Sequence, residues 1–186
     1  MIDLTSTPII ILVILGSVGV ALPVVSIALK ERPSMMSYGI ATLIAMFASI
    51  GYVLYQIALE HVAPAAIFSQ DVLVDDAFGS LFAIAMLIVA IFTTIGSFSY
   101  MKNKANPSVY FSLILLSTIG MVLVAYSTDL VMLFVAWELM SIPTYILVGF
   151  LKKDPISNEA AIKYFLFGAL SSAIIIYGIS LAYGIT

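Results

Sequence analysis

The chain alternates between long apolar runs and short segments that hold most of its charged residues. At a rise of 1.5 Å per residue, about 20 apolar residues in an α-helix cross a hydrocarbon core of about 30 Å. Six runs reach or approach that length. The pattern therefore predicts an all-α, polytopic membrane protein with six transmembrane helices, at about residues 9–29, 38–59, 77–99, 108–127, 130–151 and 159–183.

The connections between these runs are short, so we expect residues 1–186 to form a single transmembrane domain. Asn106-Pro107 is a start signal for the fourth helix, because proline favours the first helical position. Asp75 or Asp76 precedes the third helix and is expected to cap it. The acidic connection before them contains His61, which is expected to be a solvated loop residue.

Basic residues are distributed asymmetrically between the two predicted faces of the membrane. Six of the seven fall in the connections after the first, third and fifth helices: Lys30, Arg32, Lys102, Lys104, Lys152 and Lys153. Connections rich in Lys and Arg stay on the cytoplasmic side. The charges thus predict that both termini lie on the non-cytoplasmic side.

Composition excludes several classes of protein. Apolar residues make up 63% of the chain and charged residues 9%, which is typical of an integral membrane protein surrounded by lipid. No cluster of basic residues points to a nucleic-acid partner. With no cysteine and a single histidine, the chain is expected to hold neither a thiolate-ligated iron–sulfur cluster nor a usual zinc site. We therefore expect no cofactor and no metal in this chain.

Glu138 places a carboxylate inside the fifth apolar run. An acidic residue at mid-helix costs about 2.5–3.5 kcal/mol on insertion scales, so it requires a partner, water or a proton. Ser141 and Tyr145 follow at positions i+3 and i+7 and share its helix face, while Pro143 leaves the carbonyl of Leu139 without a helical donor. This pattern favours a proton relay, with a glutamate hydrogen-bonded between helices as the alternative.

Lys163 is the one basic residue inside an apolar run. It could form an ion pair with Glu159, four residues earlier, or it could be a desolvated lysine that takes part in proton transfer. From the expected start of the helix it lies about 6 Å deep, whereas Glu138 lies about 21 Å deep. We therefore expect a link through water instead of direct contact.

Small residues recur on the sixth helix. Gly168 and Ser172 are spaced by four positions and flanked by Ala169 and Ser171. This spacing is more typical of close helix packing than of a binding site.

Three segments closely resemble the antiporter-like membrane subunits of respiratory complex I: Trp137–Phe150, Glu159–Ala173 and Tyr177–Gly184. The N-type, called subunit 2 in mitochondria, is the most similar. The resemblance implies that Glu138 is the family's fifth-helix glutamate and Lys163 its sixth-helix lysine, both in the proton path. Supporting roles then fall to the neighbours Trp137, Ser141, Pro143 and Tyr145.

The resemblance implies a proton-translocating subunit of an NADH (or related donor):quinone oxidoreductase in a prokaryotic cell membrane, or its mitochondrial or plastid equivalent. Its partners would be other membrane subunits, with flavin and iron–sulfur clusters in partner chains. The donor could be NADH, a reduced deazaflavin or ferredoxin, and the acceptor a quinone or a phenazine. Alternatives are a subunit of a multi-subunit sodium/proton antiporter or membrane-bound hydrogenase, and a scaffold without transport.

Members of this family continue for about as long again, through two broken helices that complete a pair of inverted repeats. We therefore expect this chain to correspond to the first six helices of an N-type subunit, truncated or split. Such a portion is not expected to form a complete channel alone.

Overall fold

The computed structural model describes residues 6–29, 34–59, 72–102, 104 and 106–185. Six α-helices form within them: α1 (Thr7–Ala28), α2 (Met35–Ala58), α3 (Ala77–Tyr100), α4 (Pro107–Tyr126), α5 (Leu130–Val148) and α6 (Pro155–Ile185). All six are long and apolar enough to cross a membrane. The expected all-α class with six transmembrane helices is confirmed. His61, Lys30 and Arg32 lie outside the described residues.

The connection between α5 and α6 differs from the expected one. The α5 helix ends at Val148 with Gly149 as its C-cap, and α6 begins at Pro155. The carboxylate of Asp154 accepts the N–H of Ile156 at 3.0 Å, at the start of α6. Proline at the first helical position, preceded by a capping aspartate, explains why α6 begins four residues earlier than predicted.

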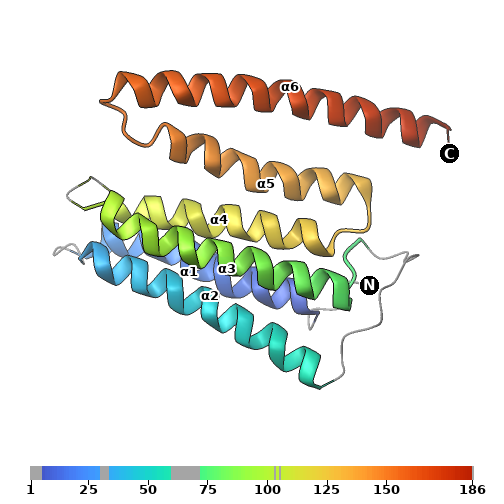
Figure 1. Ribbon diagram of the computed structural model, residues 1–186, viewed down its shortest axis with the longest axis horizontal. Helices are drawn as coiled ribbons and strands as arrows, with labels where there is room; N and C mark the ends of the chain where they lie inside the picture. Colours follow the sequence, from blue (N-terminus) through green and yellow to red (C-terminus); the bar gives the residue numbers. More distant parts are fainter. Residues whose placement is uncertain (1–5, 30–33, 60–71, 103, 105, 186) are drawn as a thin grey trace.

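The α4 helix lies at the centre of the bundle, in contact with α1, α2, α3 and α5. The α2 and α6 helices lie at opposite sides of the molecule (Figure 1). Of the described elements, α6 contacts α5 alone, and none of its described residues is buried. Helices α5 and α6, which carry the two candidate residues, therefore form the outer pair on one side of the core.

Helices α1, α3 and α5 begin at the same end of the bundle, where the first and last described residues also lie. An aspartate caps the start of each. Asp76 caps α3 and Asp129 caps α5 with their own side chains. Asp75 instead accepts the N–H of Thr7 at 2.8 Å, and so caps α1 from another segment. Each carboxylate lies at the positive end of a helix, where it is stabilising.

The described basic residues of the connections, Lys102, Lys104, Lys152 and Lys153, lie at the opposite end of the bundle (Figure 1). We expect this end to face the cytoplasm, because positively charged connections are retained there. Because the chain has no cysteine, single cysteines at Lys104 and at Thr128 can be introduced without other changes. They should react with an impermeant maleimide from opposite sides of sealed vesicles. Reaction of both from the same side would contradict the helix count.

Candidate functional site

Glu138 is the ninth of the nineteen residues of α5, so its carboxylate lies near the middle of the span. The side chain is half-buried, and its Oε1 accepts a hydrogen bond from the hydroxyl of Ser172 on α6. The carboxylate is therefore directed toward α6. Its bonded partner there is neutral.

The expected supporting residues lie on more than one side of α5. Tyr145 faces α6, where its ring packs edge-on against Tyr164 at a centroid distance of 5.0 Å. Ser141 is buried and donates to the carbonyl of Trp137 at 2.8 Å. The Trp137 side chain itself is exposed, whereas Pro143 is buried within the helix. Glu138 and Tyr145 thus share the contact with α6, and Ser141 points toward the bundle.

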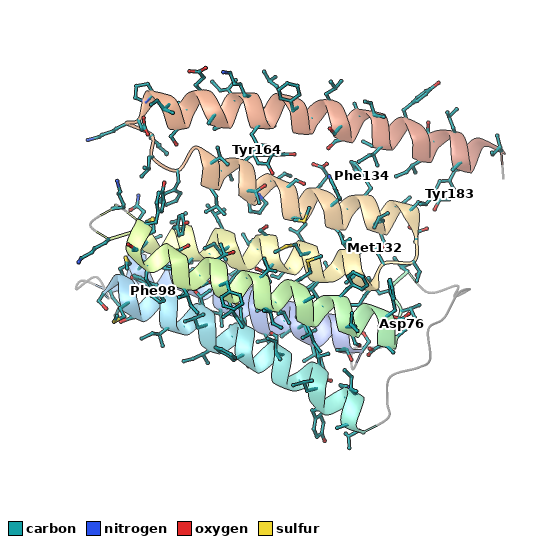
Figure 2. All side chains as sticks on the ribbon, in the orientation of Figure 1. Asp76, Phe98, Met132, Phe134, Tyr164 and Tyr183 are labelled. Atoms are coloured by element: carbon teal, nitrogen blue, oxygen red, sulfur yellow. The ribbon has the colours of Figure 1, made fainter. Side chains whose placement is uncertain are left out.

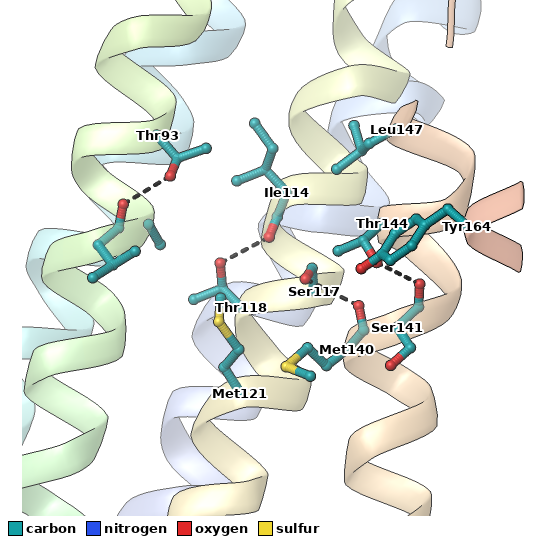
Figure 3. Close-up of a pocket in the computed structure, with 12 residues that line it drawn as sticks. Thr93, Ile114, Ser117, Thr118, Met121, Met140, Ser141, Thr144, Leu147 and Tyr164 are labelled. Atoms are coloured by element: carbon teal, nitrogen blue, oxygen red, sulfur yellow. Dashed lines mark hydrogen bonds between the residues drawn. The ribbon is translucent and has the colours of Figure 1, made fainter. Parts of the chain in front are cut away.

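Beside these residues is a cavity of about 330 Å³ between α3, α4 and α5, with α6 at its edge (Figure 3). Its polar lining consists of Thr93, Ser117, Thr118, Ser141, Thr144 and Tyr164. No charged side chain lines it among the described residues.

The serine and threonine hydroxyl groups that line this cavity all make the same kind of hydrogen bond. The five serine and threonine hydroxyls all donate to main-chain carbonyls, at 2.7 to 3.1 Å. Their oxygens therefore present acceptor lone pairs to the cavity. Water, which supplies two donors, suits this polar part of the lining, whereas the other lining residues are apolar: Val89, Ala90, Ile114, Met121, Met140 and Leu147. Apart from Ser141, these residues could not be recognised from the sequence as a group, because they come from three helices and only tertiary packing brings them together.

Lys163 does not reach Glu138. Its Nζ is paired with Glu159 Oε1 at 2.5 Å, and 65% of its side chain is exposed. Lys163 lies nine residues before Ser172, which marks the level of Glu138, so the two levels are about 14 Å apart along α6. Because α6 begins at Pro155, Lys163 is about 12 Å from the helix start, compared with the expected 6 Å.

Gly168 and Ser172 have different roles at the α5–α6 contact. Gly168 lies directly against the hydroxyl end of Tyr145, and a methyl group at this position would overlap with that ring. This agrees with the expected close packing. Ser172 was interpreted in the same way, but its hydroxyl also bonds to Glu138. The sequence signal, small residues four apart, does not distinguish these two roles.

Polar contacts join α5 and α6 along their length. Asp129 accepts the Tyr183 hydroxyl at 2.7 Å, and the Thr144 and Tyr164 hydroxyls lie 3.4 Å apart. Tyr164 and Tyr183 lie toward opposite ends of α6, on the side of α5 (Figure 2). The bond from Tyr183, with N–H groups of the first turn of α5, lowers the pKa of the Asp129 carboxyl below its usual value. These contacts hold the two helices in register on both sides of Glu138.

Comparison with known proteins identifies the family. Residues 127–186 match the family described as NADH:quinone oxidoreductase/Mrp antiporter, transmembrane. NADH-quinone oxidoreductase subunit N of Desulfitobacterium hafniense is 37% identical over 188 residues, covering 99% of this chain and 36% of that protein. Over nearly its whole length the chain is thus similar to the first part of N-type, antiporter-like subunits of complex I.

Other N-type relatives and a solved structure agree. Subunit N 1 of the NADH-quinone oxidoreductase of Koribacter versatilis is 48% identical over 61% of this chain and 22% of its own length. Subunit N of the F(420)H(2) dehydrogenase of Methanosarcina mazei is 39% identical over 64% of this chain and 24% of its own length. A chain of respiratory complex I from Thermus thermophilus with bound aureothin superimposes with a TM-score of 0.73 and 28% identity, covering 95% of this chain and 37% of that one.

This chain spans about a third or less of the length of these N-type relatives. The residues that match the family include Glu138, Lys163 and Ser172. Together with six apolar helices, this match supports a multi-pass integral membrane protein.

Proposed function

We propose that this chain acts as a proton-translocating membrane subunit of a complex I-type assembly, driven by electron transfer from NADH or a related donor to a quinone. The observation that carries the proposal is the setting of Glu138. Its carboxylate lies in the middle of a spanning helix and is bonded to a neutral hydroxyl. A charge in that setting is costly, so the occupancy of its proton responds to any cation brought near it.

In this proposal Glu138 and Lys163 exchange protons through water. Neither Glu138 nor Lys163 lines the cavity described above, but its lining includes Ser141, one turn beyond Glu138 on α5, and Tyr164, which follows Lys163 in the sequence of α6. The hydroxyl groups in its lining could bind water at a level between the two residues. We place flavin and iron–sulfur clusters in partner subunits, whose reduction shifts the charges around Glu138.

The names of the relatives point to more than one electron donor. The match in Desulfitobacterium hafniense is named for NADH and quinone, and the one in Methanosarcina mazei for F(420)H(2). The description of the matching family also includes Mrp antiporters, which favours a sodium/proton antiporter subunit as the second candidate. Dependence of proton transport on an added electron donor separates a redox-driven pump from such an antiporter.

Lys163→Met tests the relay at its cytoplasmic side. Methionine keeps much of the stem and removes the charge, so donor-driven proton pumping by the assembled complex in sealed vesicles should fall several-fold while assembly is retained. Glu159→Gln is the matched control, because it removes the ion pair and leaves the lysine charged. It should pump at close to the parental rate. Equal, normal pumping by both variants would assign Lys163 to a surface ion pair.

A further inference from the structure

The hydroxyl of Ser172 makes a different kind of bond from the hydroxyls near it. Neighbouring serines in the spanning parts of α5 and α6 donate to carbonyls of their own helix: Ser141 to Trp137, Ser171 to Phe167 and Ser180 to Tyr177. Ser172 crosses to the other helix and donates to Oε1 of Glu138. A serine in a helix can always bond to a carbonyl one turn back, so the crossing bond competes with a local alternative.

Packing around Ser172 favours the crossing bond. One turn earlier, Gly168 allows the ring of Tyr145 to lie against the α6 backbone. Tyr145 then packs edge-on against Tyr164 and Phe165, at centroid distances of 5.0 and 5.7 Å. A slip of one residue along α6 would move Ser172 by about 1.5 Å and turn it by about 100° away from α5. The register that the aromatic contacts fix is therefore the register that brings Ser172 to Glu138.

We propose that Ser172 is a positioning residue for Glu138, an inference that rests on the proton-relay function proposed above. Its hydroxyl donates to Oε1 and so holds the carboxyl group in one orientation, with Oε2 left to exchange the proton. A serine hydroxyl is both donor and acceptor, so it can bond to Glu138 in either protonation state. Ser172 itself neither gains nor loses a proton overall.

The chain offers a matched pair of serines for the test. Ser172→Ala removes the bond to Glu138, Ser172→Thr keeps a hydroxyl, and Ser171→Ala makes the same deletion at the adjacent position. Two quantities are measured on the assembled complex: protons pumped per electron transferred, and the carboxyl stretching band in redox-induced infrared difference spectra. The band that disappears in Glu138→Gln is assigned to Glu138.

We expect Ser172→Ala to lower pumping about tenfold, which is the equilibrium effect of one hydrogen bond to a charged group. The Glu138 band should move to higher frequency, where a carboxyl group without a hydrogen bond absorbs. Ser171→Ala should match the parent in both measurements, and Ser172→Thr should keep most of the pumping and the band position.

Three outcomes would overturn the proposal, and they distinguish failure of the positioning role from failure of the relay. If Glu138→Gln is impaired but Ser172→Ala pumps normally with an unshifted band, or if the two alanine variants are equally impaired, the positioning role is wrong and the relay stands. If Glu138→Gln itself pumps at the parental rate, the relay and the positioning role are both wrong.

Discussion

Replacement of Glu138 by glutamine is expected to abolish or strongly reduce proton translocation while the helix bundle stays assembled. Glutamine has nearly the same shape, and its amide oxygen can still accept the hydrogen bond that Ser172 donates. What it loses is the ability to take up and release a proton. The effect should therefore appear in the number of protons pumped per electron transferred, measured with sealed vesicles and an added electron donor.

Glu138→Asp serves as the companion variant. Aspartate keeps a titrating carboxyl group but is one methylene shorter, which draws the group away from Ser172 on α6. We expect part of the pumping to remain, because the proton can still bind although its position is less well fixed. If glutamine at this position supports pumping at the parental rate, Glu138 is a structural hydrogen-bonding residue and the relay is wrong.

The number of helices could be predicted from the sequence because an apolar run of sufficient length has one stable form in lipid. The arrangement of the helices could not. The α1 helix is more apolar than α4, yet far less of it is buried. In a membrane, an apolar side chain is equally well placed against lipid and against protein, so hydropathy does not reveal which helix is central.

The candidate site, like the fold, could be predicted only in part from the sequence. Glu138 stands out because an intramembrane carboxylate is costly, and that argument requires no structure. Its bond to Ser172 depends on the register between two helices, which the spacing of small residues leaves open. The distance of Lys163 from the start of its helix is larger than expected, because the helix was predicted to start near Glu159 and begins at Pro155. Asp154-Pro155 is the start signal that would have given the correct start.

The contact between α4 and α5 fixes the position of the helix that carries Glu138. Gly120 on α4 lies against the main chain of Leu139 and Met140, directly after Glu138. Beside it, the hydroxyl of Ser117 donates to the carbonyl of Met140 at 3.1 Å. Such a close approach of two backbones requires a residue without a side chain.

Of all single glycine-to-alanine changes in the helices of this bundle, Gly120→Ala is therefore expected to cause the largest loss of stability. The added carbon would overlap with main-chain atoms of Met140, which cannot rotate away as a side chain could. The α4 and α5 helices must then separate, at a cost of about 3 kcal/mol, the upper part of the usual range for overpacking. The measurement is the thermal unfolding midpoint of the complex in membranes, together with the amount assembled.

Gly96→Ala on α3 is the matched control, because nothing lies within 4 Å of the position that its methyl group would occupy. Alanine is the better helix former, so this variant should be neutral or stabilised by up to about 1 kcal/mol. Since α5 must move away from α4 when Gly120 is replaced, the hydroxyl-lined cavity that these two helices share should also be disturbed, and pumping should fall in whatever complex still assembles. Equal stability of the Gly120→Ala and Gly96→Ala variants would show that α4 and α5 do not pack at Gly120, and the placement of α5 against the core of the bundle would lose its support.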